Sequence, residues 1–500
     1  MGIKKINEFL RGKSAECSFI FPLKTFSGFR IAIDACLWIY KNYAVERRMY
    51  VMAMKNPLDD IDYKVIFQHV MGKFMNFNRT LVVHGITPVW VWDGKPYPEK
   101  AKCREERKDE KISKLQRVEE FRTMLQNMKF RDIAKEKEFR MILATSGSVS
   151  SDDIKYMRSL GEGVGFSSLS APHDGEILCS ALTKEGLAVA AWSTDTDNYS
   201  LGSTIIITEI VGKDDLGNCL VRVVIPYLMP KILGITRDQF VDFCIMCGGD
   251  FNENVYGIGP CKAFNLIKKY GNIDNIIIND TKHDYKCLCH LRCREIINDA
   301  KTTFQHDDAK LNFNTSRFMD TSREILQQNN LFNGYNDFIT ELKNLPAPRK
   351  IDIPGFMTVI ENTFLPKTDP GSTASASSSS GSSSSSSSSL SSSINSSSSS
   401  SSSSGSSSGI IIGKRRQITY EAATSSLNAN KQSPAIKEEK TMVNLATQIC
   451  NLSISDSIKN KDTIVSNNPT SGVLEHIGIN LSKSIAIVPG GTIKISGKLL

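Results

Sequence analysis

The stretch Thr87-Pro-Val-Trp-Val-Trp-Asp93 is almost entirely apolar and ends in a carboxylate. Two other stretches have the same character: Phe29-Arg-Ile-Ala-Ile-Asp34, and residues 187–197, which end in Asp195-Thr-Asp197. Short runs rich in Val, Ile and Trp are typical of strands that are buried on both faces of a parallel sheet. We therefore predict a central, mostly parallel sheet whose strands end in acidic side chains.

Helical patterns lie between these strands, for example at 64–81 and 173–184. Alternation of strands and helices predicts an α/β fold in which helices flank the sheet. In open α/β sheets, ligands bind beyond the carboxyl ends of the strands. The acidic ends of the three strands therefore mark the candidate functional site.

Two helical regions are expected outside this core. Residues 99–137 are dense in Lys, Arg and Glu, with apolar residues at near-helical spacing, which predicts long exposed helices. Helices predicted at 237–247 and 261–270 enclose Gly257-Ile-Gly-Pro260, which permits a tight turn with exposed N–H groups. Such a turn suits contact with a phosphate backbone, although a simple helix-capping turn also explains the glycines.

Composition limits the class of protein. The 500 residues carry a formal net charge of +8, which does not by itself identify a nucleic-acid-binding protein. Residues 371–409 are nearly all serine, so we expect a flexible linker there and a disordered tail at 410–500. The first 13 residues lack a secretory signal, and no run of about 18 apolar residues predicts a membrane span. The twelve cysteines fit free thiols in an intracellular protein.

Acidic side chains form the most informative pattern. Hard divalent cations such as Mg²⁺ bind oxygen ligands, and two such ions about 3.5–4 Å apart can hold the attacking and leaving oxygens of a phosphodiester. Clustered carboxylates imply cations, because the like charges otherwise repel. A single acid at such a place is more simply explained as a helix cap or a turn residue, so the predicted metal site depends on the joint set: Asp34, Asp93, Asp174, Glu176, Asp195, Asp197 and Asp250.

Basic and aromatic residues accompany the acids. Lys100 and Arg107 are seven residues apart, so they share one helix face from which they can point at a phosphate above the metals. A solvated helix face is the simpler alternative. Tyr40 offers a platform on which a base can stack, whereas Trp38 is better explained as a core residue.

Taken together, the motifs resemble the flap endonucleases of the XPG-type structure-specific 5′ nuclease superfamily. The resemblance covers roughly residues 1–275 and thins out to about 365. It is carried by the opening Met-Gly-Ile and by five further motifs, namely Ile-Ala-Ile-Asp34-Ala, Val-Trp-Val-Trp-Asp93-Gly-Lys-Pro, Ala-Pro-His-Asp174-Gly-Glu176, Ser-Thr-Asp195-Thr-Asp197, and Gly-Gly-Asp250 followed by Gly257-Ile-Gly-Pro.

This resemblance implies a PIN-like 5′ nuclease core with two Mg²⁺ ions, for which Mn²⁺ can substitute. Asp34, Asp93, Asp174 and Glu176 would serve the first ion. Asp195 and Asp197 would serve the second with Glu176 bridging, and Asp250 would act nearby through water. One departure is that Asp174 stands where the family usually has Glu.

The resemblance also implies roles in DNA binding and catalysis. Lys100 and Arg107 would stabilise the scissile phosphate as catalytic residues, and Tyr40 would stack against the DNA near the cut. Gly2 would lie close to the active site. Gly257 and Gly259 belong to a helix–two-turn–helix that would hold the downstream duplex, often with K⁺ in the turn.

By the same resemblance, the chain divides into regions with different tasks. Residues 1–110 would form an N-terminal nuclease region, 111–150 a helical arch or cap that threads a 5′ flap, and 151–365 an internal nuclease region with the helix–two-turn–helix near 240–275. The resemblance implies a monomeric 5′ flap endonuclease and 5′–3′ exonuclease that acts on branched DNA in replication and repair. The expected location is the nucleus, or cytoplasmic replication sites for a large DNA virus.

Several alternatives stay open from the sequence. One is a nuclease of the same family that prefers junctions or bubbles, and another is a catalytically weak DNA-binding scaffold. An unrelated D-x-D phosphatase or glycosyltransferase has no use for the glycine turn. No segment of the tail clearly matches a motif that binds the sliding clamp. Whether a clamp is a partner therefore stays open from the sequence. A zinc site is also undecided for the group formed by His283, Cys287, Cys289 and Cys293, because its spacing is not that of a standard zinc motif.

Overall fold

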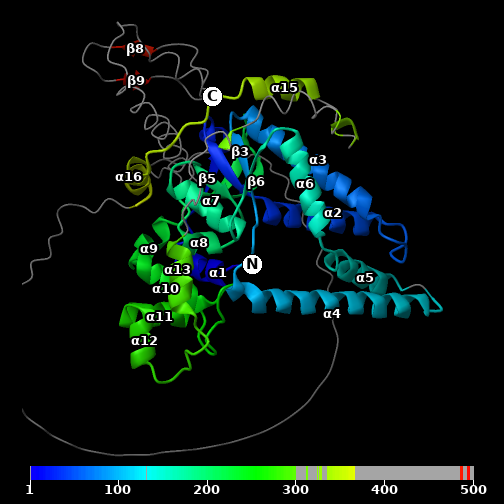
Figure 1. Cartoon of the computed structure of the whole chain (residues 1–500), viewed down its shortest axis with the longest axis horizontal. Helices are drawn as coiled ribbons and strands as arrows, with labels where there is room; N and C mark the ends of the chain where they lie inside the picture. Colours follow the sequence, from blue (N-terminus) through cyan, green and yellow to red (C-terminus); the bar gives the residue numbers. More distant parts are fainter. Residues whose placement is uncertain are drawn as a thin grey trace, which may run out of the picture. The chain divides into compact units, whose positions relative to one another are not determined.

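The computed structural model describes residues 2–130, 132–299, 311–312, 324, 326–328, 331 and 335–365, together with the backbone of two short strands near the C-terminus (Figure 1). These two strands, β8 (Ile485–Ile487) and β9 (Ile493–Ile495), pair antiparallel. The predicted linker at 371–409 and the rest of the predicted tail lie outside the described residues. No helix in the described part is long and apolar enough to cross a membrane.

A seven-stranded sheet forms the centre of the fold, in the order β1-β7-β6-β5-β2-β3-β4. The strands from β6 to β4 in this order are parallel, and β7 and β1 add antiparallel strands at one edge. The predicted mostly parallel sheet is therefore confirmed. The strands are β1 (Ser18–Pro22), β2 (Arg30–Asp34), β3 (Thr87–Trp92), β4 (Ser167–Ser170), β5 (Ala190–Trp192), β6 (Ile206–Lys213) and β7 (Cys219–Val224).

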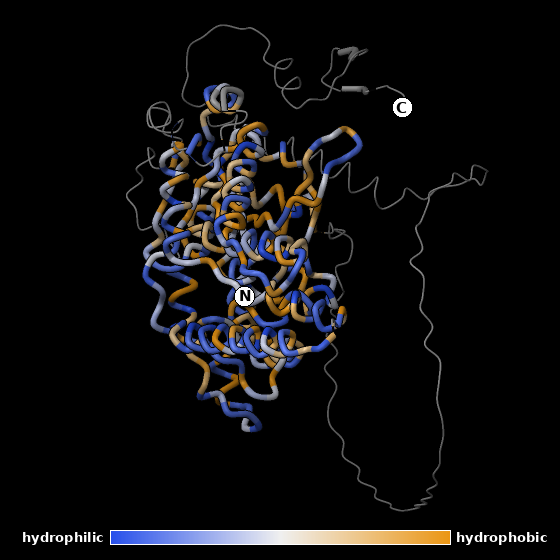
Figure 2. The backbone as a smooth tube through the Cα atoms, turned by 90° about the vertical axis from the view of Figure 1, so that its right-hand side faces the viewer, coloured by the Kyte–Doolittle hydropathy of each residue, from blue (hydrophilic) through white to orange (hydrophobic). Residues whose placement is uncertain are grey.

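Both faces of the sheet are covered, which explains why its central strands are apolar throughout. On one face, Ile31, Ile33 and Trp90 pack into the main core with helices α2 (Ala35–Ala53), α3 (Tyr63–Val83) and α6 (Ser151–Gly163). On the other face, Ala32 and Val91 pack against α7 (Gly175–Lys184). Figure 2 shows the apolar residues concentrated in the sheet and the helices around it. The predicted helices at 64–81 and 173–184 correspond to α3 and α7.

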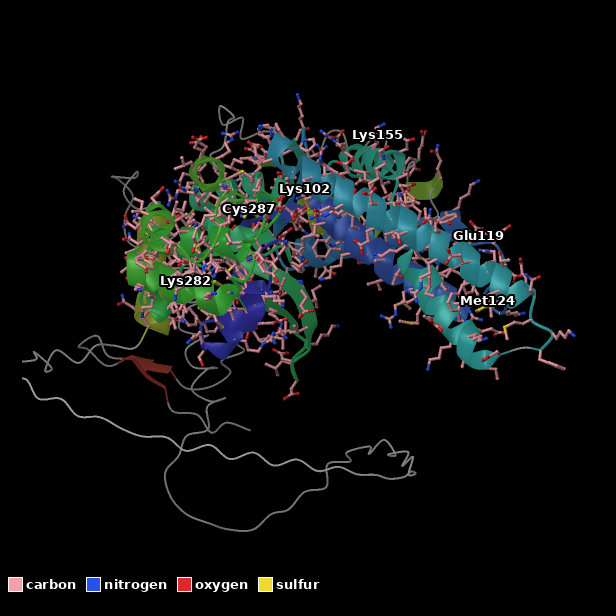
Figure 3. All side chains as sticks on the ribbon, turned by 90° about the horizontal axis from the view of Figure 1, so that it is seen from below. Lys102, Glu119, Met124, Lys155, Lys282 and Cys287 are labelled. Atoms are coloured by element: carbon pink, nitrogen blue, oxygen red, sulfur yellow. The ribbon has the colours of Figure 1, made fainter. Side chains whose placement is uncertain are left out.

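A helical hairpin extends from the sheet (Figure 1). It consists of α4 (Ala101–Gln126) and α5 (Ile133–Thr145), and Val118 is the buried residue of α4, so the expectation of long exposed helices is met. Figure 3 shows α4 running from Lys102 near its start to Met124 near its far end. The helix is continuous through residue 110, where the sequence suggested a boundary between regions.

The hairpin is anchored to the end of α2 by a small core of its own and by arginines. Val51 of α2 packs with Phe139 and Leu143 of α5. Arg140 Nη1 donates to Val51 O (2.7 Å), and the buried Arg47 donates in the opposite direction to Leu143 O (2.9 Å). These contacts hold the hairpin on the folded core through charged hydrogen bonds.

We expect Arg140→Ala to loosen α5 without unfolding the core. A hydrogen bond that involves a charged group contributes about 1.5–3 kcal/mol, so amide hydrogen exchange in residues 133–145 should accelerate by roughly tenfold or more. Arg117→Ala is the matched control, because Arg117 makes only a 3.6 Å ion pair with the exposed Glu138. Equal acceleration in both variants, or none in Arg140→Ala, would contradict the anchoring.

Four helices and the N-terminal segment pack together on the carboxyl side of the sheet. The predicted helices α10 (Arg237–Cys247) and α11 (Pro260–Tyr270) are present and flank the glycine turn. Sequence analysis did not assign α12 (Ile273–Asn279) or α13 (His290–Asn298). Phe9 of α1 (Ile6–Gly12) packs against both Phe243 and Phe264 with tilted rings, whose centroids lie at 4.9 and 5.2 Å, and so connects α10 and α11 to the N-terminal segment.

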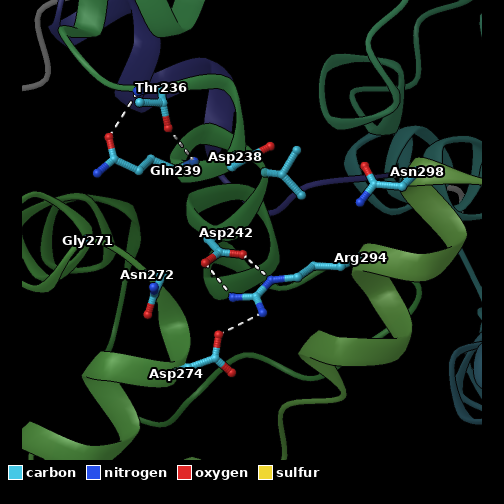
Figure 4. A pocket seen from close by; sticks show the side chains of 10 residues that line it. Thr236, Asp238, Gln239, Asp242, Gly271, Asn272, Asp274, Arg294 and Asn298 are labelled. Carbon is cyan, nitrogen blue, oxygen red and sulfur yellow. Dashed lines mark hydrogen bonds and ion pairs between the residues drawn. The ribbon is translucent and has the colours of Figure 1, made fainter.

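A pocket of about 460 Å³ lies among α10, α12 and α13 (Figure 4). Arg294 of α13 donates to both carboxylate oxygens of Asp242 (2.6 Å each) and to Asp274 Oδ2 (2.7 Å). Since these residues come from three helices, the ion pairs hold the helices together behind the glycine turn. The remaining described helices are α8 (Asp197–Leu201), α9 (Leu228–Leu233), α15 (Tyr335–Lys343) and α16 (Ile353–Phe364), with short 3-10 turns at Leu23–Phe26 and Pro98–Lys100.

Candidate active site

The strands deliver acidic side chains to one edge of the sheet. Asp34 ends β2 and caps α2, because its Oδ1 accepts from Leu37 N (3.1 Å). Asp93 follows β3, and its Oδ1 accepts from Gly175 N (2.8 Å), which connects it to the start of α7. Asp195 and Asp197 follow β5. The arrangement matches the expectation that parallel strands present their carboxyl ends to one site.

The remaining acids reach this edge from helices. Asp174 is the N-cap residue of α7 and Glu176 lies in its first turn. Asp250 comes shortly after the end of α10. All seven carboxylates predicted from the sequence lie within electrostatic reach of others in the set, as their mutual effects on pKa show below.

Burial raises the pKa values of five of these acids, Asp34, Asp174, Glu176, Asp195 and Asp197, and neighbouring carboxylates add to the shift. Desolvation by burial raises the pKa of Asp34 well above its usual range, and the charges of Glu176, Asp93 and Asp195 raise it further. Desolvation likewise raises the pKa of Asp197, reinforced by Asp195, Glu176 and Asp250. Burial raises the pKa of Glu176 to about 7 even though the Lys100 ammonium opposes the shift. The cluster therefore has a strong electrostatic demand for cations.

Lys100 lies among the carboxylates. Its Nζ is 3.0 Å from Glu176 Oε1, 3.2 Å from Asp174 Oδ2 and 3.9 Å from Asp250 Oδ2. Desolvation opposes the charged form, but the charges of Glu176, Asp174 and Asp197 raise the pKa of the buried ammonium, so it stays charged at neutral pH. The ammonium also lies 4.5 Å from the ring centroid of Phe251.

Arg107 approaches the same cluster from the next turns of α4. Its Nη2 donates to Asp250 Oδ2 at 2.6 Å. The shared helix face predicted for Lys100 and Arg107 therefore points at the acids. In this structure the Lys100 ammonium and the Arg107 guanidinium are both paired with carboxylates, whereas the sequence suggested that they point toward a phosphate.

The residues present fit divalent cations. The carboxylates supply the hard oxygen donors that Mg²⁺ and Mn²⁺ prefer, and Asp197 Oδ2 is buried without a hydrogen-bond partner. No group of three His, Cys, Asp or Glu side chains in the described ranges is arranged as a ready-made metal site. The Lys100 ammonium instead pairs with three of the acids, Asp174, Glu176 and Asp250.

Gly2 lies directly against the acids, as expected. A Cβ added at Gly2 would lie 2.2 Å from Asp195 Oδ1 and 2.5 Å from Thr196 Oγ1, and the backbone has a φ of +86°. The N-terminal segment is fixed there because Lys4 N donates to Gly248 O (3.0 Å). Only glycine fits this approach without displacing Asp195.

Tyr40 and the glycine turn lie at the surface. The Tyr40 side chain is 40% exposed on α2, and burial of the remainder with the nearby Cys36 and Asp93 raises its pKa. Trp38 is buried, as predicted. Gly257 has a φ of +76°, and neither Gly257 nor Gly259 has an atom within 4 Å of an added Cβ. The turn is thus open to a ligand but is not part of the acidic cluster.

Two aromatic residues near the site were not singled out from the sequence. Phe251, directly after Asp250, lies under the Lys100 ammonium. Tyr97 stacks on His173 with ring centroids 3.9 Å apart, and His173 Nδ1 hydrogen-bonds Lys95 O (2.8 Å). These contacts hold the loop that leads into Lys100. The only signal available was their position next to the predicted acids and bases.

The structure also shows the surroundings of the Cys and His residues for which the sequence left a zinc site undecided. Cys293 Sγ donates to Asn252 Oδ1 (3.2 Å), and His283 hydrogen-bonds Asp280 and Lys262. Within the described part of the chain these side chains form no cluster of metal ligands.

Comparison with known proteins agrees with this geometry. Residues 1–114 match the family model of the XPG N-terminal domain, and residues 165–250 match that of the XPG I-region. Flap endonuclease 1 of Leishmania major is 30% identical over 291 residues, which is 57% of this chain and 69% of that protein. Flap endonuclease 1 of Naegleria gruberi is 27% identical over 310 residues, 60% of this chain and 73% of that protein.

Solved structures of the same kind also match. The catalytic core of Rad2 in complex with DNA substrate is 17% identical with a TM-score of 0.45, covering 68% of this chain and 100% of that one. Flap endonuclease-1 from Methanococcus jannaschii is 18% identical with a TM-score of 0.42, and the match covers 66% of this chain and 96% of that one.

The carboxylates at the edge of the sheet and the two XPG segments define a nuclease. More narrowly, the chain belongs to the flap endonuclease family of XPG-type nucleases. The resemblance and the fold class inferred from the sequence are confirmed.

Proposed function

We propose that this protein is a structure-specific DNA endonuclease that cuts 5′ flaps and degrades DNA in the 5′–3′ direction during replication and repair. The observation that carries this proposal is the convergence of seven carboxylates with Lys100 and Arg107 at the base of a helical hairpin. Its membership of the flap endonuclease family supports the same substrate class.

The acids divide into two proposed ion sites. Asp34, Asp93, Asp174 and Glu176 would serve the first Mg²⁺, and Asp195 and Asp197, together with Glu176, would serve the second. Asp250 would act nearby through water, and Mn²⁺ is an alternative ion. Such ions would neutralise charge on the phosphodiester and lower the pKa of an attacking water.

The basic residues then act on the phosphate. The Lys100 ammonium, which contacts Asp174 and Glu176, would be free to donate to a phosphate oxygen when these carboxylates serve as metal ligands. Arg107 exchanges Asp250 for the phosphate in the same way. Preorganised donors of this kind stabilise the charge that develops during cleavage.

The remaining predicted residues hold the DNA. We propose that Tyr40 stacks on a base near the cut, that Gly2 leaves space for Asp195, and that the turn with Gly257 and Gly259 lies against the downstream duplex. The hairpin of α4 and α5 is the proposed arch for the flap. The protein is proposed to act as a nuclear monomer on branched DNA, and a sliding clamp stays an open partner.

A cleavage panel tests this function. The full chain with Mg²⁺ is given end-labelled 5′-flap, nicked, blunt and four-way-junction DNA. We expect preferred cutting at the base of the 5′ flap. Preference for junctions or bubbles would assign a different branch of the family, and binding without any cutting would support the scaffold alternative.

Glu176 should make the metal-free protein sensitive to pH. Burial raises the pKa of Glu176 from its ordinary value of 4.5 to about 7 in the folded chain, so its protonation stabilises the fold at low pH, and this contribution is lost as pH rises from about 4.5 to 7. In EDTA, the melting temperature should therefore fall across this range more steeply than in Glu176→Gln. Ca²⁺ or Mg²⁺ affinity should rise over the same range, because binding displaces the proton. A flat profile shared by both proteins would contradict the assignment.

A further inference from the structure

Three backbone carbonyls around the glycine turn converge on one side-chain atom. Asn254 Nδ2 lies 2.7 Å from Ile258 O, 3.3 Å from Met246 O and 3.3 Å from Cys247 O. Met246 and Cys247 lie in the last turn of α10, where helical carbonyls have no partner within the helix. Ile258 is the central residue of the turn. One amide group thus closes the turn onto the end of α10.

Neighbouring side chains serve further carbonyls of the same region. Asn252 Nδ2 donates to Ile245 O (3.1 Å), in the same last turn of α10. Lys262 Nζ donates to Gly257 O (3.3 Å). The ammonium is itself held by His283 Nε2 (2.7 Å), whose other ring nitrogen lies 2.7 Å from Asp280 Oδ2. A fixed positive charge therefore lies at the glycine turn.

The resemblance to flap endonucleases implied K⁺ in this turn, and the residues present do not fit that ion. A K⁺ ion needs several oxygen atoms directed at one point, whereas here the carbonyls face an N–H donor. The reverse orientation of the amide would set Asn254 Oδ1 against three carbonyl oxygens, which is unfavourable unless a cation lies between them.

We infer that Asn254 and Lys262 replace the monovalent cation, so that this turn holds duplex DNA without K⁺. The inference depends on the proposed role of the turn in duplex binding. A bound ion leaves the site when its concentration falls, whereas a side chain is always present. Lys262 supplies the positive charge toward the phosphates that the ion would otherwise provide.

The test compares K⁺ with Li⁺ at constant ionic strength. Binding of the full chain to a fluorescein-labelled nicked duplex is followed by anisotropy, with Ca²⁺ in place of Mg²⁺ to prevent cleavage. The wild-type dissociation constants should agree within about twofold, since no ion-binding equilibrium is coupled to duplex binding. A loss of about fivefold or more in Li⁺ would overturn the inference.

The substitution Asn254→Asp should make duplex binding depend on K⁺. A carboxylate beside three carbonyls creates an oxygen cage, so this variant should bind duplex at least about fivefold more weakly in Li⁺ than in K⁺. Asn275→Asp is the matched control, because Asn275 Nδ2 donates to the single carbonyl of Tyr270 (3.0 Å). Asn254→Ser, which removes the amide and leaves space, is the second variant if the first fails to fold.

Thallium-205 NMR gives a readout that does not require DNA. With Ca²⁺ present to fill the acidic cluster, a bound Tl⁺ signal is expected for Asn254→Asp or Asn254→Ser and not for wild type. A bound signal in wild type that Asn254→Leu abolishes would overturn the inference. Failure to bind duplex in any salt would instead count against the proposed function of the turn, and the thallium result would still decide the cation question.

Discussion

Replacing Asp195 by Asn should reduce flap cleavage by roughly a thousandfold, about 4 kcal/mol in the activation barrier, while changing duplex affinity by less than about twofold. Asn keeps the shape of the side chain, and its carbonyl oxygen can still accept from Asp197 N, as Asp195 Oδ1 does at 3.1 Å. What is lost is one negative charge in a cluster whose charges are proposed to hold the second ion. Fold and DNA contacts elsewhere should therefore persist.

Single-turnover cleavage of a 5′-flap substrate and anisotropy with Ca²⁺ separate these two effects. Asp152→Asn is the control, because Asp152 is an exposed acid on α6 that pairs only with Lys155 on the surface. Undiminished cutting by Asp195→Asn would remove Asp195 from the proposed metal site. An equal loss of duplex affinity would show that its main role is to position DNA.

The sequence predicted the acidic edge because buried parallel strands have an unusual composition. Every residue of β3 is buried, so its apolar run stops only where the chain leaves the sheet at Asp93. The strand β4 escaped prediction because Ser167-Ser-Leu-Ser170 forms the opposite edge of the sheet and carries little apolar signal. Sequence patterns therefore report burial better than they report strand pairing.

Contacts between distant segments were beyond the reach of local patterns. The spacing of Lys100 and Arg107 predicted that they share a helix face. It could not predict that Glu176 and Asp250 would be their ion-pair partners. The hydrogen bond from Arg47 to the backbone carbonyl of Leu143 helps to anchor the hairpin. It could not be predicted from the sequence, because every residue has such a carbonyl. Likewise, Asn254 is an ordinary loop residue until the fold brings three carbonyls around it.

Lys100→Met should have opposite consequences for the metal-free and metal-bound protein. Lys100 is 7% exposed and its ammonium lies within 3.2 Å of two carboxylates, so its removal leaves buried negative charges without a partner. Breaking a buried ion pair in this way typically costs about 3–5 kcal/mol, which predicts a clearly lower melting temperature in EDTA. Saturating Ca²⁺ should restore most of that loss, because the ions neutralise the same carboxylates.

The same substitution should also separate metal binding from catalysis. Ca²⁺ should bind the variant more tightly than wild type, since no ammonium has to leave the carboxylates first. Cleavage should nevertheless fall by about 100-fold with little change in duplex affinity, because the phosphate loses a preorganised positive charge. Lys102→Met is the matched control, as Lys102 is an exposed neighbour on α4 that pairs with the exposed Glu253. If the stability loss persisted in saturating Ca²⁺, Lys100 would be a structural residue of the fold. If Ca²⁺ affinity were unchanged, the ammonium would not share its place with the ions, and the proposed exchange between carboxylates and phosphate would have to be abandoned.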